Sequence, residues 1–264
     1  MTHLPLLALV LLAVSALFSM IGMGGGILYV PILLLAGFSI QQASPTSLIL
    51  ITATSLSALA TYWRHQRVDW RLALVIDPPT DVMAFVGGCI SSLVPVKILE
   101  AVLVGVLLLA GILMLRPLPR SHRVIAPPRS RRYWRREFRG ITYTVDLPPV
   151  LLATGAIGLL SGMLGITGGI IKLPIMVLLC GVPMDIAVAT STVMVTATAL
   201  SGLIGHAIRG TVPWHAGLVL AGAAVAGGLV GSRISLAIDR ARLRTMFGIV
   251  VLAIAARIAL RLCA

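Results

Sequence analysis

The chain has 264 residues, of which 58% are hydrophobic and only 11% are charged, and its mean hydropathy is +1.04. A soluble domain carries about 25% charged and about 45–50% apolar residues, so this composition excludes a soluble globular protein. The net charge of +13 would suit nucleic-acid binding, but it is concentrated in short connections between apolar segments, as the positive-inside rule describes. We therefore expect an integral, multi-pass membrane protein with membrane lipids around it and no nucleic-acid partner.

The cysteines and the N-terminus give no sign of a cofactor or of processing. Cys89, Cys180 and Cys263 are widely spaced and form neither a CxxC nor a His/Cys metal pattern, so we expect no metal, no cofactor and no disulfide framework. The first apolar stretch has no Lys or Arg before it and no clear cleavage site, so we do not expect a cleaved signal peptide.

Apolar segments follow one another along the chain, at residues 4–36, 43–62, 72–94, 98–115, 149–180, 185–206, 214–236 and 243–262. Most have about 20 residues, the length of a helix that crosses about 30 Å of hydrocarbon. The first and the fifth are too long for one span and too short for two. Each contains a glycine cluster followed by a proline, which predicts a helix that breaks near mid-membrane and resumes as a short or re-entrant piece.

These two glycine clusters are two copies of one motif. The first reads GMGGGILYVP at residues 22–31, and the second reads GITGGIIKLP at residues 165–174, which is 143 positions later. Broken membrane helices in corresponding positions of two halves point to the binding site of a transporter.

Similar residues recur after the motif at a fixed offset of 144 positions. The matched pairs include Thr46 and Thr190, Ser47 and Ser191, Thr52 and Thr196, Thr54 and Thr198, Trp70 and Trp214, and Gly87 and Gly231. This pattern predicts a duplication with a site between the halves. The expected fold is all-α: a polytopic transmembrane helical protein of two homologous repeats, each with a glycine-broken or re-entrant helix and three further spans.

A basic, proline-rich linker joins the two halves. We assign residues 1–116 to the first transmembrane repeat, 117–147 to a basic cytoplasmic linker and 148–264 to the second transmembrane repeat. Arginines without matching acids keep a short loop in the cytoplasm, and this topological role is the simplest one. Binding of anionic lipid headgroups or of a regulator is the alternative.

The relative orientation of the repeats depends on how the long segments are counted. If each counts as one crossing, the repeats run parallel, and if each counts as two, they are inverted. Inversion places Arg240, Arg242 and Arg244 in the cytoplasm, as the charge rule prefers, but leaves Arg257 and Arg261 outside. The positions of the arginines favour inverted over parallel repeats but do not decide between them.

The paired glycine-proline motifs, the basic central loop and the spans rich in small residues resemble the sulfite exporter TauE/SafE family of membrane permeases. The resemblance covers nearly the whole chain. It implies export or uptake of small sulfur-containing anions, such as sulfite, sulfonates or sulfoacetate, driven by an ion gradient across a bacterial-type cytoplasmic (inner) membrane. Substrates vary within the family, so the anion itself stays open. The chain departs from the motif at Thr167, where the first motif has glycine, and this makes the two half-sites chemically unequal.

The residues of the two motifs are the first candidates for substrate binding. They are Gly22, Met23, Gly24, Gly25 and Gly26 in the first half and Gly165, Thr167, Gly168 and Gly169 in the second. A helix that resumes after such a break presents unpaired N–H groups and the positive end of its dipole to an anion. The alternative is that these glycines only allow tight helix packing.

Lys172 and its repeat counterpart Tyr29 follow the glycines by a few residues. A lysine within a membrane segment costs about 2.5–3.5 kcal/mol on insertion scales, so it is normally functional or reaches the interface. We expect Lys172 to pair with an oxygen of the substrate, with Tyr29 donating a hydrogen bond from the other half. The resemblance agrees, because a lysine just before the proline recurs in similar proteins. A snorkelling lysine is the alternative.

Hydroxyl side chains on the helices after the breaks are further candidates, namely Ser47, Thr52, Ser191 and Thr196. Hydroxyls can donate to sulfur oxyanions and complete a cavity wall. They can equally bond to their own helix backbone one turn earlier, or to a neighbouring helix.

Asp77 and Asp81 flank Pro78-Pro79-Thr80 and are candidates for proton coupling. Their spacing of four places both on one helix face, and an intramembrane carboxylate is a candidate proton relay. Neither acid is repeated in the second half. An interfacial aspartate that caps a proline-bent helix is the alternative.

Two other classes of protein compete with a transporter. An intramembrane protease would use Ser201 with His206, or Ser161 with His215, but Ser201 and His206 lie five residues apart and off a common helix face, so we expect no enzyme. A passive channel for small organic anions is the second alternative, although two repeats in one chain favour a complete two-half cavity. The oligomeric state stays open.

Overall fold

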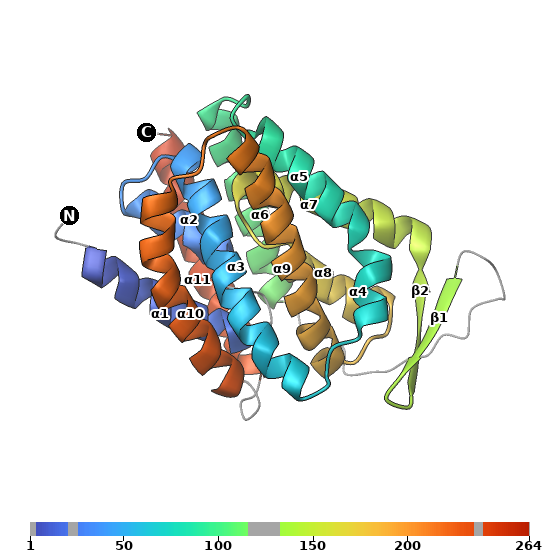
Figure 1. Cartoon of the computed structure of the whole chain (residues 1–264). Coiled ribbons are helices and arrows are strands. Elements are labelled where there is room, and N and C mark those ends of the chain that lie inside the picture. The colour runs from blue at the N-terminus through green and yellow to red at the C-terminus, as the bar shows by residue number, and fades with distance from the viewer. Residues whose placement is uncertain (1–3, 21–25, 116–132, 235–239, 264) are drawn as a thin grey trace.

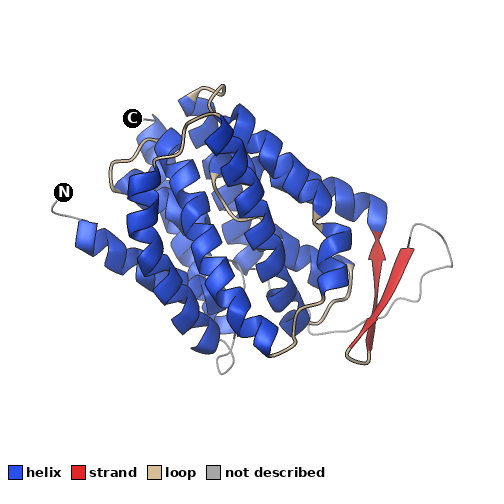
Figure 2. Cartoon of the chain, viewed as in Figure 1, coloured by secondary structure: helices blue, strands red, loops and turns tan. Residues whose placement is uncertain are grey.

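The structure is a computed structural model of the chain, and it describes residues 4–20, 26–115, 133–234 and 240–263 (Figure 1). Helices form nearly all of the described part, and one β-hairpin lies at an end of the helical bundle (Figure 2). The predicted all-α polytopic fold is confirmed.

The elements follow the apolar segments of the sequence. The first half consists of α1 (Leu4–Met20), α2 (Gly26–Leu35), α3 (Ile40–Arg64), α4 (Trp70–Ile76), α5 (Pro78–Ser91) and α6 (Val96–Leu115). The hairpin of β1 (Tyr133–Phe138) and β2 (Ile141–Asp146) comes next. The second half consists of α7 (Leu147–Leu164), α8 (Gly169–Pro174), the π-helical turn η1 (Ile175–Leu179), α9 (Met184–Ile208), α10 (Trp214–Ile234) and α11 (Arg240–Cys263).

Several helices have the length and composition of membrane spans. In the described part these are α3, α6, α7, α9 and α10, and the bent pair α4–α5 makes a sixth if it is one span. The two helices of this pair meet at 53°, because Pro78 and Pro79 lack the N–H groups that would continue α4 without a break. Large apolar side chains such as Leu74 and Leu152 are exposed on the outer surface, where they would contact lipid.

The helices of the two halves interlock. α5 packs against α7 and α9, and α10 packs in the same way against α1 and α3. Glycines allow these approaches, because a Cβ added to Gly87 would lie 2.3 Å from Leu159 O, and one added to Gly231 would lie 1.8 Å from Ala16 O. These two contacts involve residues at the repeat offset, so each is the counterpart of the other.

The equivalent helices α3 and α9 run antiparallel, as Figure 1 shows. Leu48, early in α3, lies beside Gly202, late in α9. Ala58 and Tyr62, late in α3, share an apolar cluster with Val188, early in α9. The helix α3 thus runs opposite to its counterpart α9, as inverted repeats would require.

Part of the segment assigned to the linker forms a hairpin that the sequence analysis did not predict. β1 and β2 pair antiparallel from Tyr133 opposite Asp146 to Phe138 opposite Ile141. The turn between them is formed by Arg139 and Gly140, with φ of 53° and 75°, and two positive φ values are typical of a type I′ hairpin turn. Residues 117–132 of the linker lie outside the described residues.

Candidate functional site

The second long apolar segment is interrupted at its glycine motif, and the first motif begins between two described helices. In the second half α7 ends at Leu164 and α8 begins at Gly169, and in the first half α1 ends at Met20 and α2 begins at Gly26. The predicted site residues Gly22, Met23, Gly24 and Gly25 lie outside the described residues.

Gly165 fixes the break in the second half. It ends α7 in the left-handed conformation, with φ of 68°, and a Cβ there would lie 2.2 Å from Ser44 O. Its carbonyl accepts a hydrogen bond of 2.6 Å from Ser47 Oγ of α3. The broken segment of one half is therefore tied to the first long helix of the other half.

The two motifs meet inside the protein. A Cβ added to Gly26, at the start of α2, would lie 2.5 Å from Thr167 Cγ2 and 2.3 Å from Ile51 Cδ1. Thr167 is buried, and its hydroxyl has no hydrogen-bonding partner among the described residues. The ends of both interruptions thus lie side by side, as a site between the halves requires.

Lys172 lies at the centre of a buried polar network. Its side chain is 1% exposed, forms an ion pair with Asp77 Oδ1, and donates to Thr198 Oγ1 at 2.9 Å. Thr198 Oγ1 in turn donates to Asp81 Oδ1 at 3.0 Å. Lys172 therefore does not snorkel, and both predicted acids join it in one network that links α8, α9 and α5.

The proline bend places Asp77 in this network. Asp77 is the last residue before α5, at the corner where α4 ends, and Pro78 occupies the first position of the new helix. Asp81 follows one turn later on the same face and is half-buried. The second oxygen of Asp77, Oδ2, is buried and has no hydrogen-bonding partner in the described part of the chain.

A small cavity lies against Gly168, whose other neighbours include the side chain of Lys172, although Lys172 itself does not line it. It has a volume of about 10 Å³, which is room for about one water molecule, and it is lined by residues of both halves, including Ile27, Val106, Ser161, Thr167 and Gly168. Most of the lining is apolar, so the few polar groups would orient whatever enters. Tyr29 is not among the lining residues that the structure describes.

Tyr29 occupies the position in the first half that corresponds to Lys172 in the second. Its hydroxyl forms a hydrogen bond of 2.7 Å with Thr54 Oγ1, and Thr54 is the repeat counterpart of Thr198. The same contact is thus present in both halves, as phenol and hydroxyl in one and as ammonium and hydroxyl in the other. The halves are chemically unequal at this position, because only the second has a cationic side chain there.

Most of the other predicted hydroxyls bond to their own helices. Thr52, Ser191 and Thr196 donate to the carbonyls of Leu48, Val188 and Thr192, at 2.8, 2.9 and 2.8 Å. Ser47 reaches the opposite half, through Gly165. Thr198, one of the matched hydroxyls through its pairing with Thr54 at the repeat offset, is the hydroxyl that contacts Lys172.

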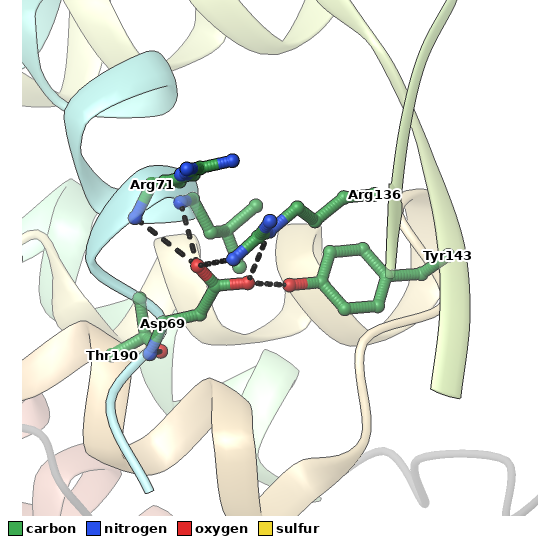
Figure 3. A network of polar contacts seen from close by, with 6 residues as sticks. Asp69, Arg71, Arg136, Tyr143 and Thr190 are labelled. Carbon is green, nitrogen blue, oxygen red and sulfur yellow. Dashed lines mark hydrogen bonds and ion pairs between the residues drawn. The ribbon is translucent and has the colours of Figure 1, made fainter. Parts of the chain in front are cut away.

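A second polar network, at Asp69, joins the hairpin to the start of α4 (Figure 3). Asp69 Oδ1 accepts from the backbone N–H groups of Arg71 and Leu72, at 3.1 and 3.2 Å. The guanidinium of Arg136 on β1 donates to both carboxylate oxygens, at 3.0 and 3.2 Å, and the hydroxyl of Tyr143 on β2 donates to Oδ2. Nothing in the sequence analysis pointed to this cluster.

The charge of Asp69 is stabilised by this environment. Burial raises the pKa of the carboxyl, but the hydrogen bonds from Arg136, Tyr143 and Leu72 outweigh it and hold the pKa below its usual range. Asp69 N also donates to Thr190 Oγ1 of α9, at 3.1 Å. The cluster therefore connects the hairpin and the start of α4 with α9.

The sequence model of the family described as "Sulfite exporter TauE/SafE" matches residues 7–258 of the chain. The chain belongs to the TauE/SafE family. The probable membrane transporter protein YunE of Bacillus subtilis is 30% identical over 230 residues, which cover 82% of this chain and 83% of that protein. The probable membrane transporter protein YfcA of Escherichia coli K12 is 26% identical over 230 residues, covering 86% and 79%. The archaeal relative MJ0441 of Methanocaldococcus jannaschii, also named a probable membrane transporter protein, is 28% identical over 216 residues, covering 79% and 74%. No solved structure matches the chain significantly.

As a TauE/SafE family member, the protein is a multi-pass membrane transporter, and the resemblance found in the sequence is confirmed. In this TauE/SafE protein the interrupted helices, the buried ion pair and the cavity lie in one region between the halves. A buried lysine that is already paired with a carboxylate neutralises an incoming anion only if the anion replaces the carboxylate as its counter-ion.

Proposed function

We propose that the protein is a secondary transporter that moves small sulfur-containing anions, such as sulfite, sulfonate or sulfoacetate-like compounds, across the cytoplasmic (inner) membrane. The site lies between the two repeats, near the middle of the membrane, and transport is coupled to protons. The observation that carries this proposal is Lys172, a fully buried cation near the second interruption, whose neighbour Gly168 lines a small cavity. The sulfur-containing class rests on the family, since the relatives are named only as probable transporters.

The reciprocal packing supports movement by alternating access. α5 and α10 each pack mainly on helices of the other half. Each of these two helices is therefore an arm, a helix of one half that is packed against the other half. Inverted repeats of this kind alternate between outward-open and inward-open states when one set of helices rocks against the other. The cavity beside Lys172 is too small for an organic anion, so we expect it to widen during this motion.

The test is flux into proteoliposomes that contain the purified chain. Labelled sulfite, thiosulfate, sulfate, taurine and sulfoacetate are offered with and without an imposed pH gradient. We expect saturable flux of at least one sulfur-containing anion, stimulated by the gradient.

Variants of the two lysines locate the site. We expect K172A to reduce flux at least about tenfold, because the only buried cation of the cavity region is lost and no other described group compensates an anion there. The matched control is K97A, which removes the chain's other lysine, an exposed one at the start of α6, and should transport normally. Equal flux in K172A and wild type would remove Lys172 from the site.

The apolar lining favours a second candidate, a transporter or channel for other small organic anions. Ile27, Val106 and Ile157 would surround a short hydrocarbon chain better than they would surround bare sulfite. Saturable flux of small carboxylates, with no flux of the sulfur compounds, would support this candidate. Flux that does not saturate and ignores the pH gradient would identify a channel instead.

A further inference from the structure

We propose that Lys172 exchanges one anionic partner for another during transport. In the empty protein it pairs with Asp77, and when a monovalent anion enters the cavity beside Gly168, Asp77 takes up a proton and Lys172 turns to the anion. Each negative charge is then carried together with one proton. This proposal rests on the anion site proposed above and adds the mechanism that couples it to protons.

The first observation is that Asp77 is the counter-ion of the buried lysine. Its side chain is buried, it contacts the ammonium of Lys172 through Oδ1, and its Oδ2 has no hydrogen-bonding partner among the described residues. A carboxylate buried in this way is stable only while the lysine neutralises it. If the lysine turns away, the carboxylate becomes neutral by taking up a proton, because an uncompensated buried charge costs more.

The second observation is that the lysine stem lies near Gly168, a residue of the cavity wall. A Cβ added to Gly168 would lie 3.4 Å from Lys172 Cε, and Gly168 itself lines the cavity. Lys172 does not itself line the cavity, and Gly168, which lies between them, has no side chain. The ammonium is carried on a flexible four-carbon stem, so it can move from Asp77 towards the cavity by rotation of side-chain bonds.

The third observation is that the cavity is lined by hydroxyl groups that could donate hydrogen bonds to an anion. The hydroxyl of Thr167 is buried without a partner in the described structure, and Ser161 also lines the cavity. Hydroxyls donate hydrogen bonds to oxyanions, so an anion in the cavity would meet both groups in addition to the ammonium. Thr167 is the residue at which the second motif departs from the first, and the departure supplies this hydroxyl to the half that carries the lysine.

Only Lys172 and Asp81 are close charged neighbours of Asp77 in the described part of the chain. Asp81 lies on the same helix and accepts from Thr198, which also accepts from Lys172. α7 offers Thr154, which donates to Ile76 O at 3.3 Å, and contains no titratable residue. Other titratable groups lie elsewhere on the surrounding elements: Asp69 and Arg71 at the start of α4, Arg136 and Tyr143 on the hairpin, Cys180 after η1, and Asp185 and His206 near the two ends of α9.

The exchange conserves charge and atoms. Before it, the ion pair of Lys172 and Asp77 is neutral. After it, the ion pair of Lys172 and the anion is neutral, and Asp77 is a neutral carboxylic acid whose proton comes from water on the side of entry. No covalent bond other than this O–H bond forms, and release of the anion on the other side reverses both steps.

The test is proton uptake on binding, measured calorimetrically with the purified full-length protein in buffers of different ionisation enthalpy. The probe is methanesulfonate, a monovalent sulfonate whose own charge does not change near neutral pH. We expect about one proton taken up per anion in alkaline buffer, and an affinity that falls about tenfold per pH unit there. D77N should bind the anion without proton uptake, and the control D185N, which alters an exposed aspartate on α9, should behave as wild type.

Three results would overturn the exchange. Wild-type protein that binds the anion without proton uptake would leave the anion site standing but refute the coupling, and this result needs no variant to fold. Uptake that persists in D77N and disappears in D81N would place the proton on the other acid. Absence of any anion binding, with carboxylates also offered as probes, would refute the anion site itself, and the exchange with it.

The path of the lysine is tested separately by G168A. The added methyl group would lie 2.6 Å from Ile157 Cγ2 and beside the lysine stem, so it narrows the route from Asp77 to the cavity while leaving the ion pair in place. We expect anion affinity to fall about tenfold or more with proton uptake per bound anion unchanged. G105A on α6 is the control, since a Cβ there meets no described atom within 4 Å. Unchanged affinity in G168A would refute this path.

Discussion

At the residue scale, Gly165 combines two requirements that exclude every other residue type. Its φ of 68° is left-handed, and a Cβ would lie 2.2 Å from Ser44 O. We expect G165A to lower the free energy of unfolding by about 2–4 kcal/mol, from left-handed strain and from overpacking against a backbone oxygen. Thermal unfolding of the purified protein measures this.

Gly181 provides the control that separates the two causes. It has the same φ of 68°, but a Cβ there meets no described atom within 4 Å. G181A should therefore show only the conformational cost, about 1–2 kcal/mol. If both variants lose the same stability, the close approach to Ser44 has no role in fixing the break.

Lys172 and Asp77 show what can and cannot be predicted for single residues. A lysine and an aspartate within apolar segments are each recognisable as functional candidates, because membrane interiors disfavour unpaired charge. Their pairing is not recognisable, because residues 77 and 172 meet only through the interlocking of α5 with helices of the other half. The same interlocking hides the role of Thr198.

At the element scale, the Asp69 cluster fixes the hairpin to α4. Because the folded pKa of Asp69 lies below its ordinary value, the charged cluster stabilises the fold above that ordinary value and loses this contribution as the pH falls through the folded pKa. R136Q removes two charge-assisted hydrogen bonds, which contribute about 1–3 kcal/mol, so the pKa of Asp69 should rise and the cluster should open in less acidic solution.

Hydrogen exchange of the hairpin and α4 as a function of pH measures this opening. R135Q is the control, since Arg135 is the neighbouring residue of the same strand and is exposed. We expect R136Q to lose amide protection at higher pH than wild type, and R135Q to follow wild type. Identical profiles for all three proteins would show that the hairpin is held by its apolar contacts, such as Val145 with the α4 cluster, rather than by the ion pair.

The helices were predictable and the hairpin was not. Apolar length and glycine-proline interruptions located the helices and their breaks, because both depend on local sequence. Residues 72–94 were expected as one segment, and the proline pair inside it divides it at Asp77. The hairpin lies in a stretch dominated by arginine, where the signals for a strand are only the alternation of Tyr143 and Val145 and the glycine of the turn. The arginines of this stretch fit the positive-inside pattern of a cytoplasmic loop, and this signal was stronger than the signals for a strand.

At the scale of the whole molecule, the reciprocal packing predicts that equivalent substitutions have equivalent effects. Gly87 and Gly231 are counterparts, and a methyl group on either would collide with a backbone oxygen across the interface between the halves. We expect G87A and G231A each to lower the free energy of unfolding by about 1–3 kcal/mol, because overpacking separates α5 from α7 in one and α10 from α1 in the other.

Measurements of transport show whether α5 and α10 move together with the helices on which they pack or only touch them. If each arm must move together with the helix it packs against, both glycine variants should also slow transport, and by similar factors, while G222A on α10, where a Cβ meets no described atom within 4 Å, should not. Loss of transport in only one of the two would mean that the halves contribute unequally to the motion. The chemistry of the halves is already unequal, because the second half supplies Lys172 where the first supplies Tyr29. Equal effects of the two glycine substitutions would therefore show that a symmetric helical scaffold carries an asymmetric site.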